Sequence, residues 1–104
     1  MMMIAATYYR AQGGKMTIYR TVHPPFTIIT LDEPGQILEL QSLTYQGETD
    51  LMDAWLRCHV TGSELQVASN LLPGWILLLS LGPTGVPFKK GDELRVIRKS
   101  PPNP

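Results

Sequence analysis

The sequence predicts an all-β fold, either a small barrel or a compact sandwich, with at most one short helix. Three observations predict it. β-branched and aromatic residues occur in short runs, and these residue types are enriched in strands. Apolar and polar residues alternate within several runs, which gives a strand one buried face. Nine glycines and nine prolines separate the runs at close intervals, as in small β proteins.

Eight runs are predicted as strands. The first two flank Gln12-Gly13-Gly14, where glycine allows the tight turn of a hairpin. His23-Pro24-Pro25 then interrupts strand pairing, because proline has no backbone N–H to donate. The predicted strands cover residues 3–10, 15–22, 26–31, 36–45, 54–60, 64–69, 75–81 and 93–99. In residues 36–45 the apolar phase shifts after Leu40, which predicts a β-bulge near residues 41–42.

Residues 50–60 have two interpretations. As a helix, the segment has acidic residues at its start, Arg57 near its end and Gly62 as a C-cap. As a strand over residues 54–60, it alternates apolar and polar positions. The inward residues would then be Ala54, Leu56, Cys58 and Val60, and the outward residues Trp55, Arg57 and His59. We favour the strand, followed by a hairpin, although Ser63 and Gln66 could also form the capping box of a short helix.

The segment of residues 75–81 is apolar on both faces. Such a strand is typical of the centre of a sheet or of an interface. We therefore predict self-association through Trp75, Leu77 and Leu79. Residues 100–104 contain three prolines and are predicted to be a disordered tail. The single domain is expected to span residues 1–99, since 104 residues suit one core.

Charge is segregated along the chain, although the net charge is zero. Residues 1–31 carry three basic and no acidic side chains, residues 32–64 carry seven acidic and one basic, and residues 65–104 carry five basic and two acidic. The pattern predicts that both ends pair with the middle in one fold. The alternative is one acidic face that docks a basic partner. The zero net charge argues against binding through bulk attraction to phosphates.

Reactive chemistry is not predicted. Cys58 is the single cysteine, which excludes an intrachain disulfide and a multi-cysteine zinc site. In a strand, Cys58 and His59 point to opposite faces and cannot act together. His23 lies in a predicted loop. We therefore expect no catalytic residue, no metal site and no cofactor, and we predict that the protein is not an enzyme.

The expected location is the cytoplasm. The N-terminal residues lack a signal-peptide pattern. The longest apolar stretch, residues 71–81, has 11 residues and contains a proline and a glycine, whereas a membrane-spanning helix needs about 20 apolar residues.

Two groups of residues are candidates for binding. If residues 54–60 are a strand, Trp55, Arg57 and His59 project from one face. Tryptophan and arginine dominate many protein interfaces, so this group predicts a non-catalytic protein-interaction module. The alternative group lies on the first hairpin, where aromatic rings and positive charge could bind single-stranded nucleic acid. That group consists of Tyr8, Arg10, Tyr19 and Arg20.

Residues 34–72 resemble the bacterial SH3-like barrel domains. Pro34-Gly35 opens a strand, a strand led by Trp55 follows, Thr61-Gly62-Ser63 forms a tight turn, and residues 69–72 close the match. The sequence departs from the family at residues 65–67, Leu-Gln-Val, where the family usually has Gly-Trp-Val. The resemblance implies an SH3-like barrel of five to seven strands and a binding role, and it implies no catalytic residues.

Overall fold

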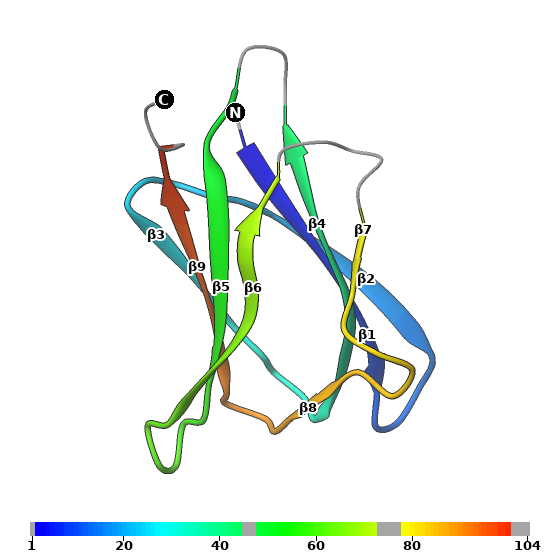
Figure 1. Cartoon of the computed structure of the whole chain (residues 1–104). Coiled ribbons are helices and arrows are strands. Elements are labelled where there is room, and N and C mark those ends of the chain that lie inside the picture. The colour runs from blue at the N-terminus through cyan, green and yellow to red at the C-terminus, as the bar shows by residue number, and fades with distance from the viewer. Residues whose placement is uncertain (1, 45–47, 73–77, 101–104) are drawn as a thin grey trace.

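A computed structural model describes residues 2–44, 48–72 and 78–100 of the chain. These residues form nine strands and no helix, so the predicted all-β fold is confirmed and the short-helix alternatives are wrong (Figure 1). The strands are β1 (Met2–Arg10), β2 (Lys15–Thr21), β3 (Phe26–Thr30), β4 (Gly35–Thr44), β5 (Leu51–Arg57), β6 (Glu64–Leu71), β7 (Leu78–Ser80), β8 (Val86–Phe88) and β9 (Glu93–Lys99).

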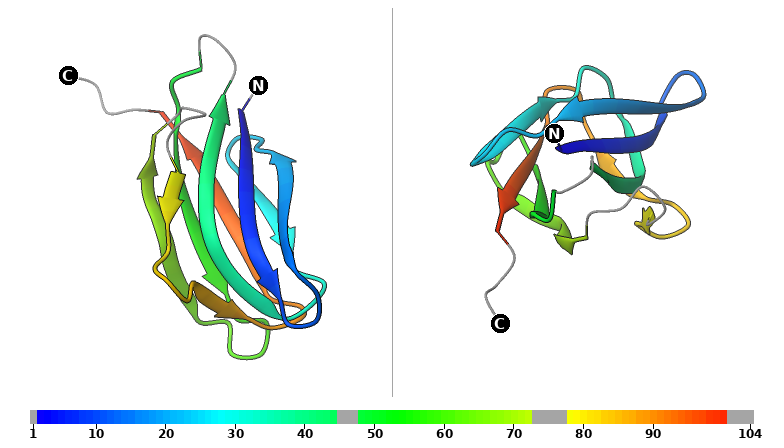
Figure 2. Two further views of the ribbon diagram at one scale, coloured as in Figure 1. Left: turned by 90° about the vertical axis from the view of Figure 1, so that its right-hand side faces the viewer. Right: turned by 90° about the horizontal axis from the view of Figure 1, so that it is seen from above.

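The strands form two antiparallel sheets. One sheet has the order β2-β1-β4-β7, and β8 also pairs with β4. The other has the order β3-β9-β5-β6. Consecutive strands change sheet twice early in the chain, between β2 and β3 and between β3 and β4. The two sheets face one another across a shared core, which gives the compact two-layer arrangement seen in Figure 2.

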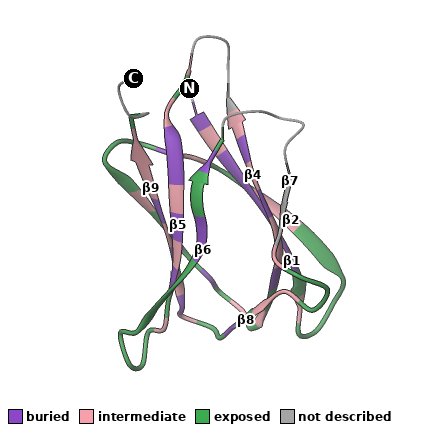
Figure 3. Ribbon diagram, viewed as in Figure 1, coloured by how far each residue is buried: buried purple, intermediate pink, exposed green. Residues whose placement is uncertain are grey.

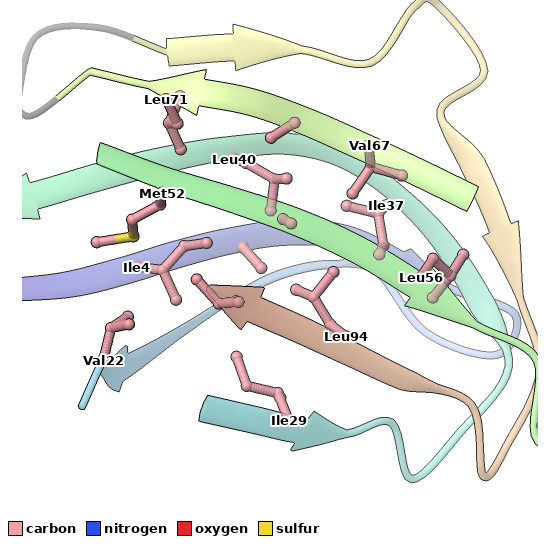
Figure 4. Packing of buried hydrophobic residues seen from close by; sticks show 14 of the residues in the cluster. Ile4, Val22, Ile29, Ile37, Leu40, Met52, Leu56, Val67, Leu71 and Leu94 are labelled. Atoms are coloured by element: carbon pink, nitrogen blue, oxygen red, sulfur yellow. The ribbon is translucent and has the colours of Figure 1, made fainter. Parts of the chain in front are cut away.

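The core lies between the sheets and is built from alternate residues of the strands. Stretches of β1, β4 and β5 are coloured as buried in Figure 3. Ile4, Ile37 and Leu40 from one sheet approach Met52 and Leu94 from the other (Figure 4). All five side chains are almost completely buried. Burying a large apolar side chain stabilises a fold by about 1.5–3 kcal/mol, so this cluster holds the two sheets together.

The β-bulge of β4 lies earlier than residues 41–42. Thr7 of β1 pairs with Glu39 and the next residue, Tyr8, pairs with Ile37, so Leu38 is the extra residue. Beyond the bulge, Ser42 points into the core and is fully buried. The prediction of residues 41–42 was wrong because it assumed that Leu43 faces inward, whereas Ser42 continues the buried face of Leu40.

Strand β5 begins and ends three residues before the predicted limits of 54–60. Met52, Ala54 and Leu56 are buried, and Arg57 is exposed on the opposite face. The hairpin to β6 begins at Cys58, whose carbonyl accepts a hydrogen bond from the N–H of Gly62 at 2.8 Å. Gly62 has a φ of 75°, which glycine adopts readily. The chain therefore turns before His59 could continue the strand.

The predicted self-association segment is only partly described. Trp75 and Leu77 lie outside the described residues, and for Leu79 only the backbone is described. Leu78–Ser80 forms β7 at the end of the order β2-β1-β4-β7, so a central position is wrong for this part. The interface interpretation stays a prediction. Of the predicted tail, residues 101–104 also lie outside the described residues.

Ion pairs join the acidic middle of the chain to its basic end. Arg98 lies 2.8 Å from Glu48 and 2.7 Å from Asp50. Lys99 lies 3.0 Å from Asp53. In a further pair, Arg95 contacts Glu64. The prediction that the basic end pairs with the acidic middle is therefore confirmed for the C-terminal strand.

Candidate binding surface

The outer face of the sheet β3-β9-β5-β6 brings together side chains from distant parts of the chain. Strand pairing aligns Ile28 with Arg95, Arg95 with Trp55, and Trp55 with Gln66. Because side chains alternate along a strand, these residues point to the side opposite the buried Leu94. We call the outward group formed by Phe26, Ile28, Trp55, Arg57 and Arg95 the outer patch.

Arg95 is held in place at the centre of the outer patch. Its guanidinium carbon lies 5.5 Å from the ring centroid of Phe26. Its Nη1 donates a hydrogen bond of 2.9 Å to Oε1 of Glu64. The contact with the ring is a cation–π interaction, and the contact with Glu64 is charge-assisted. These two contacts order a long side chain before any partner arrives, which lowers the entropic cost of binding.

Arg57 is less constrained. Its Nη1 lies 3.9 Å from the same Oε1 atom of Glu64, and its side chain is 45% exposed. Exposed pairs at such distances contribute little. The Arg57 guanidinium is therefore open to a carboxylate from a partner.

Apolar surface lies beside these charges. Phe26 is 46% exposed and Ile28 is 45% exposed, both on the edge strand β3. Trp55 is half-buried on β5. A half-buried tryptophan with arginine beside it has the composition of an interface hot spot.

His59 belongs to a different cluster from Trp55 and Arg57. It lies in the turn after β5, and its ring Nδ1 is 2.6 Å from Oδ1 of Asp92. The backbone N–H of His59 also donates to that oxygen at 3.1 Å, and the N–H of Lys89 donates to Oδ2 at 2.9 Å. Burial raises the pKa of Asp92, but these hydrogen bonds outweigh burial and hold its pKa below the ordinary value. The carboxylate thus joins the β5–β6 turn to the β8–β9 turn.

Cys58, next to His59, has its sulfur in a polar setting. The hydroxyl and N–H of Thr61 and the N–H of Val60 lower the pKa of the Cys58 thiol, while burial and the charge of Asp92 act against them. Within the described ranges, no group of three or more His, Cys, Asp or Glu side chains is placed to hold a metal ion.

The structure brings three residues of the alternative nucleic-acid group to one pocket and leaves the fourth, Tyr19, on the other face of β2. Tyr8 is buried, and its ring meets Phe88 edge-on with centroids 5.6 Å apart. It is therefore unavailable to stack on a base. Tyr19 is 54% exposed, whereas Arg20, its neighbour in β2, points to the other face. Arg10 and Arg20 line a small pocket with Tyr8 and two acids of the β3–β4 turn.

The sequence interpretation found Trp55 and Arg57 but not Phe26, Ile28 or Arg95. The alternation of residues 26–31 could have indicated that Phe26 and Ile28 point outward. It could not indicate that β3 lies beside β9 and β9 beside β5, because these strands are far apart in the sequence.

The chain matches no protein-family model, no curated protein and no solved structure. The described residues contain no helix with the length and apolarity needed to cross a bilayer.

Proposed function

We propose that this protein is a non-catalytic protein-interaction module and that the outer patch is its contact surface. The observation that carries the proposal is the fixed guanidinium of Arg95, held between Phe26 and Glu64 beside the exposed Ile28. An ordered cation flanked by exposed apolar side chains favours a protein partner. The resemblance of residues 34–72 to SH3-like domains points to the same role.

The chemistry of the patch indicates the kind of partner. Arg57 is 45% exposed and only loosely paired with Glu64, so its guanidinium can donate hydrogen bonds to a partner's carboxylate. Phe26 and Ile28 offer apolar surface on the adjacent edge strand. A segment with an acidic side chain next to apolar ones would complement both features. A cytoplasmic location, with Cys58 kept reduced, is part of this proposal.

A displayed library of random peptides tests the proposal with the whole chain as bait. We expect the selected peptides to share an Asp or Glu next to apolar residues. Trp55→Ala and Arg57→Ala should each weaken binding of these peptides about tenfold or more, as expected for hot-spot residues. Tyr19→Ala and Arg20→Ala, on the other sheet, serve as exposed controls. Peptides without acidic residues, or equal losses in the controls, would reject the outer patch.

Self-association is a second part of the proposal. It depends on the apolar segment of residues 75–81, with Trp75, Leu77 and Leu79 as the predicted contacts. Sedimentation equilibrium over a hundredfold range of concentration measures it directly. A strict monomer throughout that range would remove self-association and leave the peptide-binding role intact.

Single-stranded nucleic-acid binding remains the alternative function. The exposed rings of Tyr9 and Tyr19 favour it, whereas the burial of Tyr8 argues against it. Binding to single-stranded DNA or RNA that weakens steeply with salt would support this alternative. A protein-interaction module should show no such binding.

A further inference from the structure

A pocket of about 490 Å³ lies where the β5–β6 hairpin faces β8. Its apolar walls come from both sheets, with Leu56 and Leu65 on one side and Val86 and Phe88 on the other. β6 pairs with β5, and β8 pairs with β4, so two edge strands border the pocket. Its volume is within the range of small-molecule sites.

The charged side chains of the pocket wall differ in whether they already have a partner. The buried carboxylate of Asp92 already accepts hydrogen bonds from His59 and from the N–H of Lys89. Glu64 is paired with Arg95. Lys89 also lines the pocket and is exposed. Among the ion pairs of the described residues, none involves the Lys89 ammonium. The uncompensated charge at the pocket is therefore positive.

We propose that this pocket binds a small amphipathic carboxylate. The apolar body would pack against Leu56, Val86 and Phe88, and the carboxylate would pair with the ammonium of Lys89. An amphipathic cation fits less well, because both acids in the pocket wall are already paired. A neutral apolar molecule would leave the charge of Lys89 unused.

None of the five patch residues lines the pocket, and the two sites meet at Glu64, whose carboxylate pairs with Arg95. Binding of a carboxylate and binding of a peptide can therefore fail independently. Trp55→Ala should leave carboxylate affinity unchanged while it weakens peptide binding.

The direct test is calorimetric titration of the whole chain with unbranched carboxylates from hexanoate to decanoate, below their micelle concentrations. Each additional buried methylene should tighten binding about fourfold. Cys58, the single cysteine, lines the pocket, so its alkylation by iodoacetamide should slow as the pocket fills. The concentration that halves this rate should match the calorimetric Kd.

Two matched pairs of variants locate the ligand. Lys89→Gln should reduce the preference for a carboxylate over the alcohol of equal length about two- to fivefold, the range of an exposed ion pair. Lys90→Gln, on the neighbouring residue outside the pocket wall, should not change it. Leu65→Glu should weaken carboxylate binding at least tenfold. Leu72→Glu is its control, because Leu65 and Leu72 are 54% and 55% exposed and only Leu65 lines the pocket.

Three results would overturn the proposal. The first is an absence of saturable binding at millimolar decanoate. The second is an affinity that does not depend on chain length. The third is an equal effect of the Leu65 and Leu72 substitutions, which would place the ligand elsewhere on the surface.

Discussion

Asp92 stabilises the end of the molecule near the pocket through the hydrogen bonds of its side chain. Its side chain is only 7% exposed and receives three hydrogen bonds. The donors belong to His59 in the β5–β6 turn and to Lys89 after β8, so one carboxylate connects the two sheets. A buried acid with this many donors is stabilising only while it is ionised.

Asp92→Asn is expected to lower the free energy of unfolding by about 2–3 kcal/mol at pH 7, the scale of hydrogen bonds to a charged group. The amide cannot accept on both atoms, so its NH₂ group would face an N–H donor. Urea denaturation monitored by circular dichroism measures the loss. Asp32→Asn, at an exposed residue of the β3–β4 turn, is the control and should change stability by less than 0.5 kcal/mol, as is usual at the surface.

The same variant gives a pH dependence with a definite sign. The pKa of Asp92 lies below its ordinary value of 3.8, so ionised Asp92 stabilises the fold fully above that value. The contribution is lost as the pH falls through the lower pKa of the folded state. The stability difference between the native chain and Asp92→Asn should therefore shrink as the pH falls below 3.8. A difference that stays constant to the acid limit of folding would contradict this account.

At the scale of elements, local sequence determined which segments form strands. The pairing of the strands determined where the bulge lies and which outward residues become neighbours. The limits of β1, β2, β3 and β9 match prediction closely, because alternation and turn residues are local signals. The bulge of β4 was misplaced because Ser42, a polar residue, occupies a core position. Trp55 and Arg57 could be identified as an outward pair from alternation alone. Their neighbours Phe26 and Arg95 could not, because strand order is not a local property.

Ser42 supplies the test at this scale. Its hydroxyl is fully buried and, within the described part of the chain, has no hydrogen-bond partner. A buried polar group without a partner costs about 1–3 kcal/mol. Ser42→Ala should therefore leave stability unchanged or raise it by about 1 kcal/mol, as measured by thermal and urea unfolding. Ser69→Ala, at an exposed position of β6, should not stabilise the chain. A loss above 1 kcal/mol in Ser42→Ala would show that the hydroxyl is satisfied in solution.

At the scale of the whole molecule, the charge pattern and the strand order are two aspects of one arrangement. β9 is the last strand in the sequence, yet it lies inside its sheet between β3 and β5. Two of its basic residues, Arg98 and Lys99, therefore meet acidic residues at positions 48–53, just before and within the start of β5. The segregation of charge along the chain thus favours the non-local pairing of β9 with β5. β9 thus holds β3 and β5 in one sheet, because it pairs with both of them.

Arg98 tests this arrangement because it connects three segments. Its guanidinium donates to Asp50 at 2.7 Å, to Glu48 at 2.8 Å and to the carbonyl of Val22 at 3.3 Å, with 16% of the side chain exposed. Arg98→Met keeps the aliphatic stem and should lower the free energy of unfolding by about 2 kcal/mol, after allowance for solvent screening. Arg20→Met, on the exposed edge strand β2, should cost less than 0.5 kcal/mol.

A double-mutant cycle separates the contribution of the Arg98–Asp50 ion pair to the free energy of unfolding from the contribution of side-chain packing. In the native chain Asp50→Asn should be destabilising, because Arg98 then keeps a charge with one partner fewer. In the Arg98→Met background the same change should cost little, which gives a coupling energy of about 1 kcal/mol. Equal costs of Asp50→Asn in both backgrounds would mean that the Arg98–Asp50 ion pair adds no net stability and that the polar contribution of Arg98 rests on Glu48 and the Val22 carbonyl. The apolar face of β9, where Leu94 and Val96 are completely buried, would then contribute more than this ion pair to placing β9 between β3 and β5.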